Sequence, residues 1–209
     1  MQLIAVVKCG PVHRASFFVD PKDGRDTCTN VHILDDNLTV AGTQGQHAYL
    51  ERTAGIAAKR AMFWPTKELV AACKKEPAAY IALFDMGDQV AEWRVAHGSD
   101  HMEAIKNALN IGTTCKAMGR TTWVDNTDKP NAFNRILPPK GAQPSGVKMP
   151  MSLKLIGNFA KATPNAVRFV TYEGRSEIYV VFPDPTQLGI LMPIRDDVVP
   201  NTPEETWLA

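Results

Sequence analysis

The sequence predicts an α+β fold rich in antiparallel strands, with helices covering one face of the sheets. Short apolar runs bounded by turn residues recur through most of the chain, a pattern typical of antiparallel sheets. Only three segments, at 66–76, 101–110 and 153–161, have the 3.6-residue apolar period of an amphipathic helix. We therefore expect sheets that are backed by a few helices.

The strand-like runs follow one another along the chain with turn signals between them. Asp35-Asp-Asn and Met86-Gly-Asp predict hairpin turns. The expected strands are Leu3–Cys9, Val31–Leu34, Leu38–Ala41, Ile81–Phe84, Val90–Val95, Val167–Thr171, Ile178–Phe182 and Leu188–Met192.

The three expected helices share one design, in which an apolar side packs on a sheet and basic or amide side chains face outward. The helix at 101–110 has Ser99 or Asp100 as its N-cap, and the helix at 66–76 follows Trp64-Pro65. The side chains expected to be buried are Leu69, Val70, Cys73, Met102, Ala104, Ile105, Ala108, Leu109, Leu153, Leu155, Ile156, Phe159 and Ala160.

The chain is long enough for two domains. Its 209 residues allow two units of about 100 residues, each with a core of its own. The region 113–150 is the least regular, because prolines and glycines crowd its second half. We expect one domain over 1–98, a second over 99–195 and an acidic tail over 196–209.

The bulk composition is that of a globular protein, with 44% hydrophobic and 22% charged residues. No apolar run approaches the roughly 20 residues that span a bilayer, and residues 1–8 read as a strand rather than as a signal peptide. A cytoplasmic protein without a membrane partner is therefore expected. The four cysteines form no Cys-x-x-Cys pair, so we expect them to be reduced and mostly buried.

The net charge of +1 hides an uneven distribution. Basic residues outnumber acidic ones over 51–75 and over 140–161, whereas acids dominate 172–209. We expect one surface that attracts phosphate groups and another that repels them.

Residues that could support catalysis or metal binding are sparse. His97-Gly-Ser-Asp-His101 places two imidazoles near a carboxylate, but a helix cap with surface histidines explains the pattern better than a metal site. Cys28 and His32 share a strand face without a surrounding nucleophile motif. Gly42-Thr-Gln-Gly45 lacks the Lys-Ser/Thr of a phosphate loop. No catalytic residue, metal or cofactor is therefore predicted.

Four sequence elements follow one another in an informative order. They are Arg25-Asp-Thr-Cys-Thr-Asn-Val-His-Ile33, the strand, Thr-x-Gly turn and strand of 37–50, Phe133-Asn-Arg-Ile-Leu-Pro138, and Gly189-Ile-Leu-Met-Pro-Ile-Arg195. In this order they resemble elements of the bacterial replication sliding clamp, the beta subunit of DNA polymerase III.

The resemblance implies a DNA-clamp fold, in which repeated domains close head to tail into a ring with sheets outside and helices inside. In such a ring the inner basic residues meet duplex DNA through its phosphates and read no sequence. It implies a DNA path lined by Lys67, Lys74, Lys106, Lys154 and Lys161. The solvated faces of ordinary surface helices would show the same lysines.

The resemblance also implies a hydrophobic pocket on the outer face of the ring, which captures peptide segments of DNA polymerases and of other proteins. A Met-containing apolar groove suits adaptable peptide binding. The implied pocket residues are Cys28, Thr43, Gly45, Gln46, Ala48, Ile136, Ile190, Met192 and Arg195. Core positions in a last strand would explain Ile190 and Met192 equally well.

The chain departs from the family in length and at single positions. Gln44 replaces an acid, Gln46 a His and Cys28 a Leu, so the pocket would be more polar. Two domains per chain, where the family has three, would close a six-domain ring as a homotrimer, the arrangement of eukaryotic and some phage clamps.

Two other readings stay open. One is a clamp relative that forms no ring and binds protein or single-stranded nucleic acid as a monomer or dimer. The other is a small hydrolase built on a mixed sheet.

Overall fold

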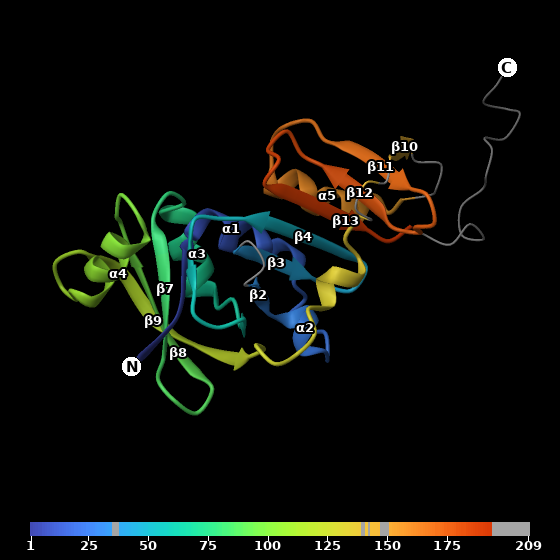
Figure 1. Ribbon diagram of the computed structural model, residues 1–209. Helices are drawn as coiled ribbons and strands as arrows, with labels where there is room; N and C mark the ends of the chain where they lie inside the picture. Colours follow the sequence, from blue (N-terminus) through green and yellow to red (C-terminus); the bar gives the residue numbers. More distant parts are fainter. Residues whose placement is uncertain (35–37, 139–140, 142, 147–150, 194–209) are drawn as a thin grey trace, which may run out of the picture.

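The computed structural model describes residues 1–34, 38–138, 141, 143–146 and 151–193 (Figure 1). Their strands join in one antiparallel array, in the order β10-β11-β12-β13-β4-β3-β2-β6-β9-β8-β7-β1-β5. The strands are β1 (Gln2–Lys8), β2 (Val31–Leu34), β3 (Thr39–Thr43), β4 (His47–Arg52), β5 (Gly55–Ala57), β6 (Ala61–Phe63), β7 (Tyr80–Asp85), β8 (Val90–Ala96), β9 (Cys115–Asp125), β10 (Pro144–Gly146), β11 (Arg168–Tyr172), β12 (Ile178–Val181) and β13 (Gln187–Leu191).

The helices of the described residues are short and lie between strands. None of them is long and apolar enough to cross a bilayer. They are α1 (Cys9–Ala15), α2 (Asp26–Thr29), α3 (Lys67–Lys75), α4 (His101–Leu109) and α5 (Leu153–Ala162), with 3-10 turns η1 (Ser16–Phe18) and η2 (Ala132–Arg135).

The element order contains the same half-unit twice in the first part of the chain. A leading strand, a helix and a three-stranded antiparallel meander occur as β1-α1-β2-β3-β4 and again as β6-α3-β7-β8-β9. Each leading strand adds to the meander of the other half, because β1 pairs with β7 and β6 pairs with β2. This reciprocal pairing relates the halves by an internal twofold and makes them one complete unit.

A third half-unit follows, made of β10, α5 and the meander β11-β12-β13. Its last strand continues the sheet of the first unit, since β13 pairs antiparallel with β4 and Ile190 lies opposite Ala48. The expected strand-rich α+β clamp fold is confirmed. The second unit expected over 99–195 is present as one half in the described residues.

The strand β9 is a regular element inside 113–150, the region that the sequence predicts to be the least regular. It pairs with β8 from Cys115 to Thr122 and then with β6 from Trp123 to Asp125. A division at residues 98/99 would cut this ladder. We propose instead that the first unit extends to Asp125.

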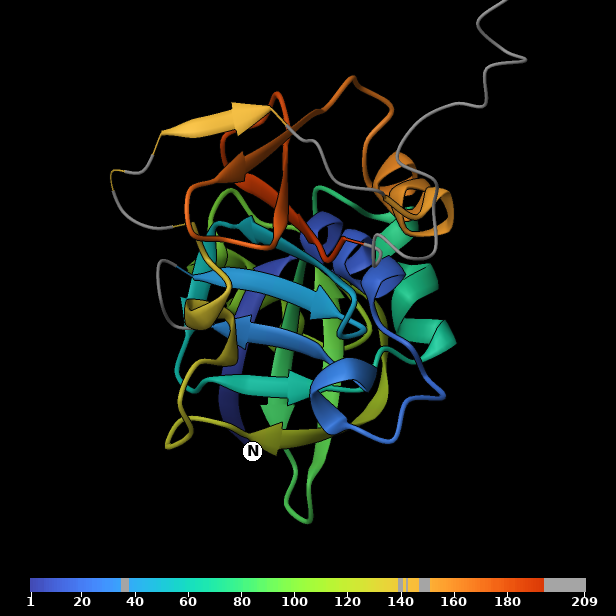
Figure 2. The same ribbon diagram turned by 90° about the vertical axis from the view of Figure 1, so that its right-hand side faces the viewer.

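Three helices form one layer, and a fourth lies on the other side of the sheet. Ile81 and Leu83 of β7 face the core that α1, α3 and α5 cover, whereas Ala82 and Phe84 face the cluster beneath α4. Alternate strand residues point to opposite faces. Figure 2 shows α1, α3 and α5 together on one side of the strands. The expectation that all helices share one face is therefore wrong for α4.

All three predicted helices are confirmed, and their N-caps explain where they begin. Thr66 Oγ1 accepts a hydrogen bond from the Leu69 amide at 3.2 Å, and Asp100 Oδ1 accepts one from the Glu103 amide at 2.9 Å. Met102 and Leu109, which were expected to be buried, are exposed, because α4 buries only its small Ala104 side. Ala160 of α5 was also expected to be buried and is exposed.

Two glycines let helices approach the sheet closely. A Cβ atom on Gly42 of β3 would lie 2.2 Å from the carbonyl oxygen of Ala15, at the end of α1. A Cβ atom on Gly189 of β13 would lie 2.4 Å from the ring of Phe159 on α5. Both helices therefore sit directly against backbone that carries no side chain.

Candidate functional site

The candidate peptide site lies on the sheet face opposite the α1, α3 and α5 layer, where β4 and β13 pair. Ala48 and Ile190 face each other there, in a cluster that includes Phe133 and Tyr179. The first unit, the third half-unit and the segment between them thus meet at one place.

The Thr-x-Gly turn at one end of this strand pair is fixed by its own hydrogen bonds. Thr43 Oγ1 accepts from the Gly45 amide at 3.0 Å and donates to the His47 carbonyl at 3.0 Å. Gly45 has φ +87°, a conformation that favours glycine. The Met192 amide donates to the Gln46 carbonyl at 2.8 Å, which ties the end of β13 to the turn.

The segment that connects the two units is held against the same face. Tyr179 Oη donates to the Ile136 carbonyl at 3.1 Å, and Arg175 Nη2 donates to the Leu137 carbonyl at 3.2 Å. Phe133 is buried at 3% exposure and meets the His32 ring edge to face, with centroids 5.1 Å apart. These contacts place Ile136 beside the end of β13.

These three elements enclose a small cavity of about 40 Å³. It is lined by Thr43, Gly45, Gln46, His47, Ala48, Ile136, Ile190 and Met192. All except His47 were named from the sequence. Cys28 does not line this cavity, because it is buried in α2, and Arg195 lies outside the described residues.

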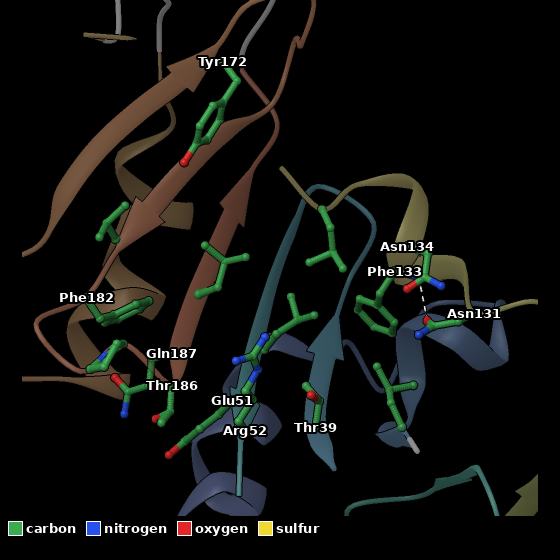
Figure 3. Close-up of a pocket in the computed structure, with 16 residues that line it drawn as sticks. Thr39, Glu51, Arg52, Asn131, Phe133, Asn134, Tyr172, Phe182, Thr186 and Gln187 are labelled. Carbon is green, nitrogen blue, oxygen red and sulfur yellow. Dashed lines mark hydrogen bonds between the residues drawn. The ribbon is translucent and has the colours of Figure 1, made fainter. Parts of the chain in front are cut away.

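A larger cavity of about 450 Å³ opens at the other end of the same strand pair (Figure 3). Sequence reasoning missed it. Its walls come from β4, β13 and the 131–137 segment, and Figure 3 shows Phe133 on one side and Tyr172 and Phe182 on the other. Arg52, Thr186 and Gln187 supply polar groups along the wall. The available sequence signal was the position of Leu50, two residues after Ala48 in β4, because alternate strand residues lie on the same sheet face.

His47 links this face to the helix layer. Its side chain is buried, and its Nε2 lies 2.9 Å from Asn158 Nδ2 on α5. Asn158 Oδ1 accepts from Lys161 Nζ at 3.1 Å, which leaves the amide NH₂ to donate to the imidazole. Burial lowers the pKa of His47 to about 4, so the ring is neutral at pH 7.

The helix layer presents most of the predicted basic residues together. Lys67 and Lys74 are exposed on α3, and Lys154 and Lys161 are exposed on α5, while α1 lies between these helices and contacts both. Lys106 lies on α4 and therefore projects from the opposite side of the sheet. It therefore does not share a side with the other four lysines, which the sequence could not show, because the period of a helix does not reveal which sheet face it covers.

Basic groups on α1 were missed by sequence reasoning. Burial, together with the charges of Lys74 and Arg14, lowers the pKa of His13, so both cations act on this imidazole. Pro11 near the start of α1 was the available signal, since proline is tolerated in the first turn of a helix.

His97 and Asp100, which the sequence places near each other, make structural contacts. His97 Nε2 lies 3.0 Å from Glu76 Oε2. Asp100 caps α4. Within the described ranges, no three His, Cys, Asp or Glu side chains are grouped as they would be around a metal ion.

Comparison with known protein families and with curated proteins gave no match. Solved structures share the fold. The DNA polymerase III subunit beta of Pseudomonas aeruginosa aligns with a TM-score of 0.56 at 12% identity, covering 91% of this chain and 66% of that one. The beta subunit of Borrelia burgdorferi aligns with 0.59 at 9%, covering 91% and 63%, and the sliding clamp of Bacillus subtilis with 0.59 at 10%, covering 100% and 68%.

The chain spans about two thirds of the length of these solved chains. At these identities the likeness concerns the fold, and it agrees with the order of elements and the reciprocal strand pairing described above. The chain has the fold of the bacterial DNA polymerase III beta sliding clamps.

Proposed function

We propose that the protein is a clamp-like processivity factor or recruitment platform, which holds duplex DNA against its helix layer and captures peptide segments on its outer face. The role requires binding surfaces and no catalytic step. Clamp structures from three bacteria share the fold, which supports the proposal.

The observation that carries the proposal is the convergence on the outer face. The turn at 43–48, the segment at 133–138 and the end of β13 are far apart in the sequence, yet they line one cavity. The resemblance to clamps named these elements from sequence alone. Ala48, Ile136, Ile190 and Met192 give the cavity apolar walls that suit the hydrophobic side chain of a linear peptide.

The DNA-binding part of the proposal is supported by the charge on the helix layer. Lys67, Lys74, Lys154 and Lys161 are exposed on one side of the sheet, on the two helices that contact α1. Contacts from such lysines to phosphates are independent of sequence and weaken with salt. Lys106 lies on α4, on the other side of the sheet, so substituting it serves as a control for binding at the helix layer.

The first experiment measures retention on DNA. A nicked circular duplex is incubated with the protein, the salt concentration is raised, and retention is compared before and after the circle is cut. We expect retention on the circle and loss after linearisation, with at least about tenfold weaker binding for Lys154→Glu/Lys161→Glu. Lys106→Glu should bind like the wild type. Equal loss for both variants would contradict DNA binding at the helix layer.

The second experiment tests the outer cavity. A library of random linear peptides is panned against the protein, and the selected peptides are measured with Met192→Ala. We expect at least about tenfold weaker binding for this variant. Met86→Ala, an exposed methionine on the β7–β8 turn, should leave binding unchanged. Peptides that bind both variants equally would place their site elsewhere.

A second candidate is a clamp relative that forms no ring and acts as a monomeric or dimeric binding module. The described residues favour it over the homotrimer expected from two domains, because they hold three half-units, whereas two complete units need four. The DNA retention experiment separates the two candidates, because an open module would dissociate equally from circular and from linear duplex.

A further inference from the structure

The larger cavity on the outer face has no part in the proposed binding of DNA or of peptides. It lies at the Arg52 end of the β4–β13 strand pair, whereas the small cavity lies at the Met192 end. Its volume of about 450 Å³ falls within the range of about 300–1,000 Å³ that is usual for small-molecule sites. The small cavity, of about 40 Å³, falls far below that range. The larger cavity therefore has room for an organic molecule.

Apolar and aromatic side chains make up much of the lining. Leu50 of β4 and Leu188 of β13 lie opposite each other in the strand register, and both line the cavity. Phe133 stands on one side and Tyr172 on the other (Figure 3). Val181 of β12 lines the cavity and is still 40% exposed. A ring or a branched chain bound here would remove this apolar surface from water.

The lining also carries one positive charge that has no internal counter-charge. Its two charged residues are Glu51 and Arg52. Both carboxylate oxygens of Glu51 already accept hydrogen bonds, from Arg14 and from Tyr49. Arg52 is exposed, and no carboxylate in the described part of the chain forms an ion pair with it. In Figure 3 its side chain reaches into the space between the two walls.

We propose that this cavity binds a small organic acid, with one carboxylate at Arg52 and an aromatic or branched aliphatic body over Leu50 and Leu188. The planar guanidinium can donate two parallel hydrogen bonds to the carboxylate, which fixes the charged end of the ligand. The body fits between Phe133 and Tyr172, where an aromatic ring would meet other rings on both sides. A second carboxylate would meet no further cation in the described lining, so the site favours monocarboxylates.

The enclosure of the cavity favours a small molecule over an extended chain. The lining comes from β4, β12, β13, the 131–137 segment and residues 185 and 186 between β12 and β13, so walls rise on several sides. These elements lie on the sheet face opposite the α1, α3 and α5 layer. Binding of an acid here therefore depends neither on DNA retention nor on peptide capture.

Isothermal titration calorimetry on the full chain tests the site, with ibuprofen and its neutral amide as probes. The two probes share one apolar body, so the difference between their affinities isolates the contribution of the carboxylate. We expect the wild type to bind the acid at least about tenfold more tightly than the amide at neutral pH. Arg52→Gln should remove this preference. Arg120→Gln, at an exposed arginine of β9, should keep it.

The apolar wall is tested by Val181→Glu, which should weaken binding of ibuprofen by about tenfold or more, because it sets a like charge beside the carboxylate. Ile56→Glu is the matched control, since Ile56 of β5 is 42% exposed and lies outside the lining. It should leave the affinity unchanged. A wild type that binds neither probe, or binds both equally, would overturn the proposal. So would an Arg52→Gln variant that keeps the preference, or equal losses in the two Glu variants.

Discussion

Glu51 shows how a single buried carboxylate joins the helix layer to the sheet. It is 5% exposed and receives Arg14 Nε at 2.8 Å, Arg14 Nη2 at 2.6 Å and the hydroxyl of Tyr49 at 2.8 Å. Burial and the charge of Glu51 raise the pKa of Tyr49, so the phenol stays a donor. The carboxylate is therefore satisfied only while all of these partners are present.

Arg14→Met should destabilise the fold, because it leaves the buried carboxylate of Glu51 without its cation. Breaking such a pair typically costs about 3–5 kcal/mol, and the partial exposure of Arg14 argues for the lower end. Urea unfolding measures the loss. Arg14→Met combined with Glu51→Gln should recover part of it. A double variant less stable than Arg14→Met would contradict this explanation.

His47 should make stability depend on pH. Its folded pKa of about 4 lies below the unfolded value of 6.5, because burial disfavours the charged ring. The unfolded chain thus binds more protons between these values, so the contribution is complete above pH 6.5 and is lost as pH falls toward 4. From pH 7.5 to pH 5 the loss for this residue is about 2 kcal/mol.

Urea midpoints of the wild type and of His47→Gln at these two pH values test this expectation. The variant should lose less stability on acidification. Burial also lowers the pKa values of His32 and, with the charges of Lys74 and Arg14, His13, so some slope should remain. Identical slopes would show that His47 is not the group responsible.

At the scale of elements, the contact of α5 with β13 depends on Gly189. A Cβ atom there would lie 2.4 Å from the Phe159 ring and 2.8 Å from Val180 Cβ, so Gly189→Ala should overpack the core and cost about 1–3 kcal/mol. Gly157 on α5 is the matched control, because a Cβ atom there meets nothing within 4 Å. Gly157→Ala should be neutral or stabilising by up to about 1 kcal/mol. Thermal unfolding of the two variants should shift in opposite directions or by clearly different amounts.

The elements with strong apolar periods could be predicted from sequence. The weak ones could not. The helix α1 has only seven residues, too few to show a period. The strand β9 alternates between exposed and half-buried residues over its first half and contains Gly119, whose missing side chain makes room for the Trp93 ring. Such a strand looks like a loop until its neighbour β8 is known.

The residues of the candidate site also fall into those that the sequence could predict and those that it could not. Thr43, Gly45 and Met192 could be named because short motifs carry them, and the fold then brings the motifs together. The cavity beside Arg52 and Phe182 could not, since it forms between side chains that share no local pattern. The placement of Lys106 failed because it depends on the sheet face that α4 covers.

At the scale of the whole molecule, the internal twofold makes the two ends of the first unit equivalent. The last strand of its first half, β4, pairs along its outer edge with β13. The last strand of its second half, β9, is paired with β8 on one edge, and over Cys115–Thr122 no other described strand pairs with its second edge. An unpaired strand edge is a template for another strand.

We expect this open edge of β9 to pair with the same edge of a second copy of the chain. Met118 lies midway along the strand and is 45% exposed, which makes Met118→Asp a substitution that folding should tolerate. Light scattering should find the wild type at twice the chain mass and Met118→Asp at the mass of one chain. Met86→Asp, on an exposed turn, should keep the wild-type mass. If Met118→Asp also keeps that mass, the β9 edge carries no contact between chains.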